Sequence, residues 1–291
     1  MGYDHYERRA KALLFLWTVI CGYVKIYGMI HLQFTDKTVR KVLRFGNRDR
    51  GQGEGNMRGT IKDDTYFAEK LQKNGADIEH YEALVEKVVA ERGESDRGAQ
   101  MGYAVLFTSY RNRINLLYST GNKDSEIKPC FENLLKYYVK TWEPRYSYFD
   151  LINVLSLAVL LDVKADNELV NELIGKIRKA DYQDYLVDQL AGALDTSYEP
   201  RCPEFRWKKT YQPLKEIAEN AAVNAVDLLK QYLDDQWYGI HKECAWYGSH
   251  KTELYYGYWS FEAGAIAKLL GLDDTSLRDQ KYYPYDLVHG E

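Results

Sequence analysis

The sequence lacks the motifs that mark common enzyme active sites. It contains no HExxH helix, no GxSxG elbow and no Walker-type phosphate loop. These absences remove zinc proteases, α/β-hydrolases and P-loop nucleotide hydrolases from consideration. The glycines between residues 46 and 55 follow no strand and carry no P-loop lysine, so they are typical of a linker. The sequence gives no support to an enzymatic function.

Cysteine is scarce and unpaired. The four residues are Cys21, Cys130, Cys202 and Cys244, and no two of them form a CxxC pair. A disulfide framework or a structural zinc site needs closer and more regular spacing. The pattern therefore predicts reduced thiols and a cytoplasmic protein without a metal or other cofactor.

A hydrophobic run long enough to cross a bilayer is also missing. The longest uncharged run is Ala12–Val24, 13 residues behind a basic start, whereas a spanning helix needs about 20. It has the length of a signal-peptide core, but no small-x-small cleavage site follows. The run predicts a buried or interfacial helix, and a scaffold anchored to a membrane through residues 12–34 stays an alternative. Another is that residues 1–56 are upstream sequence translated from a misplaced start, because Met57 opens a segment typical of a protein start.

Alternating strand patterns are absent, and helical periodicity runs from Asp63 to the C-terminal region. The fold class is therefore all-α, a multi-helix bundle of stacked hairpins in two subdomains. The expected helices are 63–93, 101–117, 127–142, 147–161, 168–178, 184–194, 213–232 and 260–271. Ser147, Asp166, Asp181 with Asp184, and Ser260 are the expected N-caps, and Gly271 is the glycine after the last of these helices. Residues 282–289 are expected to be extended.

What the sequence has in excess is negative charge and tyrosine. The formal net charge is −4, but residues 57–291 hold 38 Asp/Glu against 29 Lys/Arg, a balance of −9. Tyrosine occurs 26 times and phenylalanine 9 times, and tyrosine combines apolar area with a polar tip that suits wet interfaces. This composition disfavours direct nucleic-acid binding and favours a basic protein partner.

One cluster of metal-ligand types needs separate consideration. His241, Glu243, Cys244 and His250 lie within ten residues of one another, without the PCxxC that completes a deaminase site. Four aromatic residues occupy the same stretch, which favours histidines that pack and hydrogen-bond in the fold. A metal-binding helical protein or enzyme that uses His241, Glu243 and His250 remains the alternative.

The C-terminal segment HKECAWYGSH…YYGYWSFEAGAIAKLLGLDD…YYPYDLVH resembles the C-terminal domain of the PoNi family of bacterial immunity proteins. The segment that opens MRGTIKDDTYF, with its helices up to about residue 178, resembles the N-terminal domain of the same family. The expected division is an N-terminal extension at 1–56, an N-terminal helical domain at 57–180 and a C-terminal helical domain at 181–291.

The resemblance implies an all-helical, cytoplasmic, non-catalytic protein that binds and neutralises a cognate PoNe-like DNase toxin of an interbacterial competition system. A nuclease holds DNA through basic groups, so an acidic, Tyr-rich surface can occlude it. No membrane contact is expected for residues 57–291. The candidate toxin contacts are one tyrosine and seven carboxylates of the second half: Asp234, Asp235, Glu243, Tyr247, Asp273, Asp274, Asp279 and Asp286.

Overall fold

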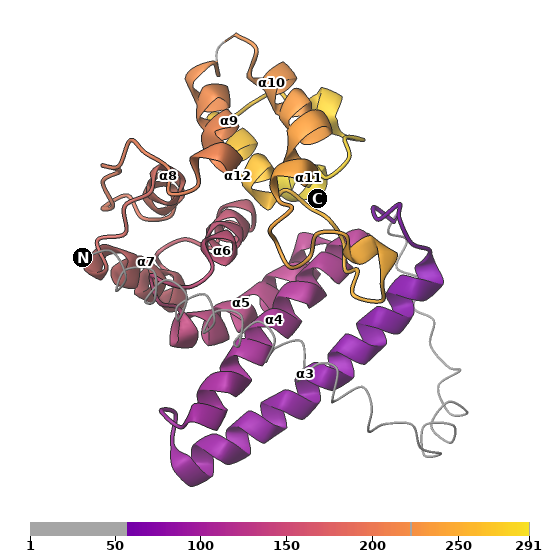
Figure 1. The fold of residues 1–291 in the computed structure, drawn as a ribbon, viewed down its shortest axis with the longest axis vertical. Coiled ribbons are helices and arrows are strands. Elements are labelled where there is room, and N and C mark those ends of the chain that lie inside the picture. The colour runs from indigo at the N-terminus through magenta and orange to yellow at the C-terminus, as the bar shows by residue number, and fades with distance from the viewer. Residues whose placement is uncertain (1–56, 222, 291) are drawn as a thin grey trace, which may run out of the picture. The chain divides into compact units, whose positions relative to one another are not determined.

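The computed structural model describes residues 57–221 and 223–290 (Figure 1). The helical periodicity after Asp63 corresponds to the longest described helix, α3 (Asp64–Arg92). Asp63 caps it, because its carboxylate accepts a hydrogen bond from the backbone N–H of Tyr66 (2.8 Å). Gly93 ends it with a positive φ of 83°. The described residues contain helices, turns and loops but no strand, which confirms the all-α prediction.

Helices α3, α4 (Arg97–Ser119) and α5 (Asp124–Thr141) form an antiparallel layer at the start of the described chain (Figure 1). α3 and α4 approach closely because Gly102 faces Val85; a Cβ at Gly102 would meet the valine side chain at 2.2 Å. α4 also packs along α5, where the Phe107 ring lies 4.7 Å from that of Tyr138. α4 is therefore the middle helix of the three.

Helix α6 (Tyr148–Leu160) is the apolar centre of the fold. Ser147 Oγ accepts from the backbone N–H of Asp150 (3.2 Å), which confirms Ser147 as the N-cap. Ten of its thirteen residues are buried, as expected for a helix that is apolar on nearly every side. It packs against α8 (Tyr185–Leu194) and, from the far end of the sequence, against α12 (Phe261–Leu270).

Helix α7 (Glu168–Lys179) packs on α5 and begins at a different cap from the predicted one. Asn167, and not Asp166, accepts from the backbone N–H groups of Leu169 (3.0 Å) and Val170 (3.3 Å). Both residue types are good N-caps, so the sequence could not choose between adjacent positions. Asp184 caps α8 as predicted, whereas Asp181, which was expected to share this role, lies in the turn before it with a φ of 45°.

The single helix predicted over 213–232 was wrong in both its bounds and its continuity. Helix α9 (Lys208–Glu219) starts five residues before Pro213, and a turn then separates it from α10 (Ala225–Gln231). A π-helical turn, η1 (Tyr232–Gln236), and the short α11 (Trp237–Ile240) follow. Alanine propensity across 218–225 is overridden because the chain turns to bury both Ile217 and Leu229.

Gly271 ends α12 in the left-handed conformation (φ 59°), as predicted. Ser260 is its N-cap by position, but its hydroxyl donates to the Glu262 carboxylate (2.9 Å) and caps no N–H. Beyond α12, the prediction of an extended 282–289 was wrong, because Tyr285–His289 forms helix α13. Its Asp286 pairs with Arg58 at the start of the described chain.

Arg58 binds the first described residues to the rest of the fold through its side chain. Its guanidinium also donates to the backbone oxygens of Tyr118 (3.1 Å) and Asn122 (2.9 Å). All described residues belong to one compact unit. The predicted interfacial helix at 12–24, the linker at 46–55 and the hypothesis of a misplaced start concern residues 1–56, which lie outside the described residues. Within the described part, no helix combines the length and apolarity needed to span a bilayer.

Candidate interaction surface

Aromatic side chains of the C-terminal segment form a stacked row, which we call the tyrosine ladder: Tyr247, Tyr238, Tyr282 and Trp237. The Tyr247 and Tyr238 rings stack at 4.5 Å, Tyr238 and Tyr282 at 6.0 Å, and Tyr282 lies 4.6 Å from Trp237. Trp237 is buried at one end of the ladder, whereas Tyr247 is 41% exposed at the other. The ladder thus leads from the core to an aromatic side chain that faces solvent.

Tyr282 occupies an unusual backbone conformation in this ladder. Its φ is 70°, a region that costs a non-glycine residue roughly 1–2 kcal/mol. Its carbonyl accepts from the N–H of Ser260 (2.8 Å), and the Lys281 ammonium lies 4.7 Å from the centre of its ring. The fold therefore holds Tyr282 in place despite its backbone strain.

Carboxylates extend from the ladder onto the neighbouring elements. Asp234, on η1, pairs with Lys230 (2.7 Å) and accepts from the side chain of Gln280 (2.6 Å). These hydrogen bonds, Lys230 first, lower the pKa of Asp234. Because Gln280 lies between Asp279 and the ladder residue Tyr282 in sequence, this contact brings η1 beside the loop that leads into the ladder.

Three carboxylates in this area are exposed and form no ion pair or hydrogen bond within the described residues: Asp235 of η1, Asp279 of the loop, and Asp227 of α10. Asp227 is seven residues before Asp234, two helical turns along the chain. We call Asp227, Asp234, Asp235 and Asp279 the acidic rim. Asp227 was missed by the sequence analysis because a single acid on a helix carries no local signal.

The other candidate carboxylates occupy three different environments. Asp273 is exposed, and its hydrogen bond from Thr275 Oγ1 (2.7 Å) lowers its pKa. Asp274 is only 1% exposed and accepts from Tyr283 and from His289 Nε2 (2.8 Å). Asp286 pairs with Arg58. Asp274 and Asp286 thus stabilise the fold with their carboxylates, whereas Asp273 faces solvent.

The residues of the metal alternative are engaged with aromatic neighbours or apart from one another. His241 is buried; its Nδ1 donates to the Trp237 carbonyl (2.6 Å), and its Nε2 lies 3.3 Å from the Tyr211 hydroxyl. His250 Nδ1 lies 3.0 Å from the hydroxyl of Tyr258. Glu243 is exposed. No group of three or more His, Cys, Asp or Glu with metal-site geometry occurs among the described residues.

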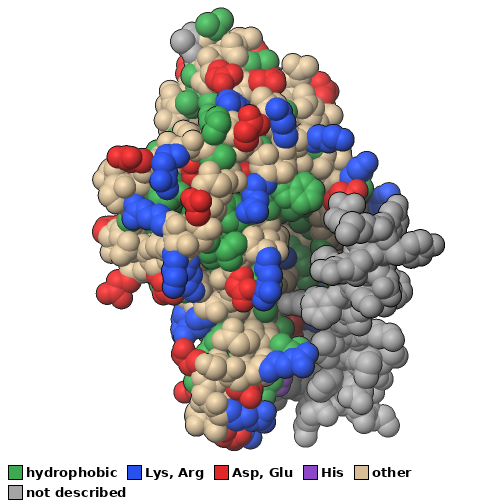
Figure 2. Space-filling view, turned by 60° about the vertical axis from the view of Figure 1, so that its left-hand side comes forward, with side chains coloured by type: hydrophobic (Ala, Val, Ile, Leu, Met, Phe, Trp, Pro, Cys, Tyr) green, Lys and Arg blue, Asp and Glu red, His purple; other side chains and the backbone are tan. Residues whose placement is uncertain are grey.

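The excess of negative charge is not uniform over the surface. On the face in Figure 2, Lys and Arg are interspersed with Asp and Glu, and apolar side chains lie between them. Elsewhere in the sequence, the exposed aromatic Trp207 (47% exposed) has basic neighbours, because it follows Arg206 and precedes Lys208 and Lys209. The excess of negative charge is therefore concentrated at defined places such as the acidic rim.

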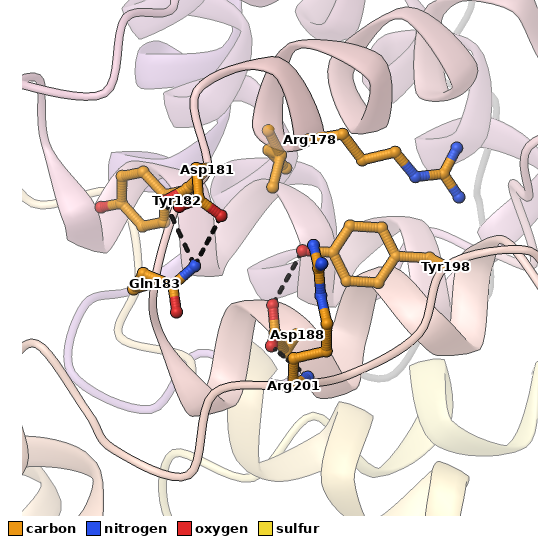
Figure 3. Close-up of a pocket in the computed structure, with 8 residues that line it drawn as sticks. Arg178, Asp181, Tyr182, Gln183, Asp188, Tyr198 and Arg201 are labelled. Atoms are coloured by element: carbon orange, nitrogen blue, oxygen red, sulfur yellow. Dashed lines mark hydrogen bonds between the residues drawn. The ribbon is translucent and has the colours of Figure 1, made fainter.

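Two buried carboxylates of α8 serve the fold, as Figure 3 shows for Asp188. Asp188 accepts three hydrogen bonds of 2.8 Å, from the Tyr198 hydroxyl and the backbone N–H groups of Arg201 and Cys202. One turn earlier, Asp184 accepts from Tyr148 and from the backbone of residue 206, yet its burial raises its pKa. The space beside Asp188 is about 10 Å³, room for at most one water molecule, so these acids hold the loop after α8.

The comparisons with known families cover both halves of this helical unit. Residues 58–173 match the family described as PoNe immunity protein (PoNi), N-terminal, and residues 182–287 match PoNe immunity proteins (PoNi), C-terminal. The chain belongs to the PoNi family. Residues 174–181, just before α8, separate the two PoNi matches, whose outer limits enclose the Arg58–Asp286 pair. The resemblance inferred from sequence is thereby confirmed, and PoNi proteins are immunity proteins by description.

A solved structure shares the PoNi fold described here. The crystal structure of protein PA2201 from Pseudomonas aeruginosa superposes with a TM-score of 0.62 at 19% sequence identity, over 81% of this chain and 90% of that chain. At this identity the likeness concerns the fold alone. No curated protein matches the sequence.

Proposed function

We propose that this PoNi protein binds and neutralises a cognate PoNe-like DNase toxin of an interbacterial competition system. It acts in the cytoplasm by stoichiometric binding, without catalysis, a cofactor or direct nucleic-acid contact. The observation that carries the proposal is the match of both PoNi segments, which together span residues 58–287. Cys130, Cys202 and Cys244 are free thiols, in agreement with a reducing compartment.

The acidic rim and the tyrosine ladder supply the contacts in this proposal. A DNase must present Lys and Arg to DNA phosphates, and a surface of carboxylates both attracts and covers such groups. Asp227, Asp235 and Asp279 have no partner among the described residues, so they pair with toxin cations without first breaking an ion pair. Tyr247, at the exposed end of the ladder, is the aromatic anchor.

The candidate contacts of the sequence analysis divide accordingly. Asp234, Asp235, Glu243, Tyr247, Asp273 and Asp279 remain proposed contacts, and Asp227 joins them. We leave Asp274 out because it is buried, and Asp286 because its partner is Arg58.

The test is rescue and binding with the nuclease toxin encoded beside this gene. Cells that express the toxin should survive when the wild-type chain is co-expressed, and absence of rescue would overturn the proposal. Asp227→Asn/Asp235→Asn/Asp279→Asn should slow association about tenfold at low ionic strength and much less at high ionic strength. Tyr247→Ala should weaken binding by about 2 kcal/mol, mainly through faster dissociation.

A matched control removes the same charge elsewhere. Glu69, Glu86 and Glu132 are exposed acids of α3 and α5 that form no ion pair among the described residues. The triple Gln variant changes the net charge by the same amount. If it slows association as much as the rim variant does, the total charge and not the rim attracts the toxin.

A further inference from the structure

A groove lies on the layer of α3, α4 and α5, which belongs to the N-terminal PoNi segment, whereas the acidic rim belongs to the C-terminal one. Its volume is about 440 Å³, within the range of about 300–1,000 Å³ typical of ligand sites. All three helices contribute residues to its lining. Because α4 packs between α3 and α5, we treat α4 as the floor of the groove. The lining residues of α4 run from Tyr110 to Leu117, about 10 Å along a helix axis.

The lining combines apolar and acidic side chains. Ile78, Leu117 and Cys130 are apolar, whereas Glu79, Glu82 and Glu126 contribute carboxylates. Arg113 is the single cation of the lining. The groove therefore carries an excess of negative charge next to apolar surface, a combination that suits a side chain with an aliphatic stem and a cationic head.

Glu82 is held in position by two tyrosines. Its Oε1 accepts from the hydroxyls of Tyr110 (2.8 Å) and Tyr137 (2.9 Å). Burial, followed by these hydrogen bonds to Glu82, raises the pKa of both tyrosines, so both remain donors at neutral pH. Both hydroxyls bind Oε1, and Oε2 of Glu82 accepts no hydrogen bond among the described residues. A fixed carboxylate loses little side-chain entropy when it binds a cation.

We propose that this groove receives a short extended segment of the toxin that carries Arg or Lys, as a second contact area beside the acidic rim. The inference rests on the proposed function, because it takes the toxin as the partner. A groove of about 10 Å matches about three residues of extended chain. Charge complementarity selects a basic segment, with the cationic head at Glu79 and Glu82 and the stem on the apolar lining.

The experiment measures the affinity of the full chain for the nuclease toxin encoded beside its gene, carrying an inactivated active site. Glu79→Gln/Glu82→Gln should weaken binding at least tenfold, because Gln keeps the acceptor for the tyrosines but removes the charge. Glu86→Gln/Glu132→Gln removes the same charge outside the groove and should bind like wild type. Asn133→Trp, which fills the groove, should also weaken binding at least tenfold. Unchanged far-UV circular dichroism and Tm identify variants that remain folded.

Hydrogen exchange supplies a readout that does not depend on any substitution. Bound toxin should slow exchange in the peptides that cover residues 75–82 and 126–133. If wild type binds and rescues but the groove variants bind equally tightly and these peptides are unprotected, the groove inference is overturned and the proposed function stands. If wild type neither binds nor rescues, both are overturned.

Discussion

Asp188 is the residue whose replacement gives the most direct test of how the C-terminal PoNi segment is held together. Its carboxylate accepts from the hydroxyl of Tyr198 and from the backbone N–H groups of Arg201 and Cys202, all at 2.8 Å. Asp188→Ala leaves these three donors without an acceptor. The Tyr198 hydroxyl belongs to a buried residue, whereas water reaches the backbone of the more exposed Arg201.

The cost follows from these environments. An unsatisfied buried donor costs about 1–3 kcal/mol, and the two partly solvated N–H groups belong at the lower end of that range. Asp188→Ala should therefore destabilise the protein by about 3–5 kcal/mol. Asp188→Asn should cost only about 1–2 kcal/mol, because the amide oxygen can accept from both N–H groups while the amide nitrogen donates to Tyr198.

Urea unfolding followed by circular dichroism measures both free energies. Trypsin adds a local readout, since loss of the tether should expose the peptide bond after Arg201 to faster cleavage in Asp188→Ala. The reasoning is refuted if the alanine and asparagine variants are equally destabilised, or if alanine costs less than about 1 kcal/mol. A small cost for alanine would mean that apolar contacts alone hold the loop after α8, whereas equal losses would mean that the asparagine amide cannot replace the carboxylate as the acceptor.

Two further predictions concern a glycine and a half-buried acid. Gly257→Ala should destabilise the protein by about 2–4 kcal/mol in the same unfolding assay, because the φ of Gly257 is 126° and a Cβ would lie 2.4 Å from Ser119 Oγ. Gly175→Ala in α7 is the control: its added Cβ meets nothing within 4 Å, so this variant should be neutral or slightly stabilising. Burial is the main cause that raises the pKa of Asp124 from 3.8 to about 6, so the folded state binds this proton more tightly and loses stability as the pH rises from about 4 to about 6. Asp124→Asn should then be about 1 kcal/mol more stable than wild type at neutral pH, a value reduced because the side chain is partly exposed, and equally stable at about pH 4. An equal effect on stability at both pH values would contradict the raised pKa of Asp124.

The sequence predicted the elements whose causes are local. Ser147, Asp184 and Gly271 were identified as helix ends because capping depends on a few adjacent residues. The burial of ten of the thirteen residues of α6 agrees with apolar residues on nearly every side of that helix. These features need no knowledge of what lies across the fold.

Two of the failures have long-range causes. α13 forms with Asp286 in its first turn, and Asp286 pairs with Arg58, 228 residues earlier. The break between α9 and α10 places Ile217 and Leu229 in one core, against the helix propensity of the alanines between them. Neither contact leaves a signal in the local sequence.

The candidate surface was predictable in composition but not in arrangement. Acidic and tyrosine-rich character was evident, and Tyr247 and Asp235 are exposed as expected of contacts. Asp274 looked the same as Asp273 in sequence, yet one is buried and the other faces solvent. The groove of α3, α4 and α5 was missed because its carboxylates come from helices that only the fold brings together.

The Arg58–Asp286 pair also means that the order of the helices along the chain could be changed while their packing is kept. The pair holds the first described residues beside α13, so a short linker could join residue 290 to residue 57. New ends could then open in the turn between α9 and α10, where Val223 is 86% exposed. Such a circular permutant would carry α10 to α13 ahead of α3 and would divide the C-terminal PoNi segment between its two ends, around an unchanged core, acidic rim and groove.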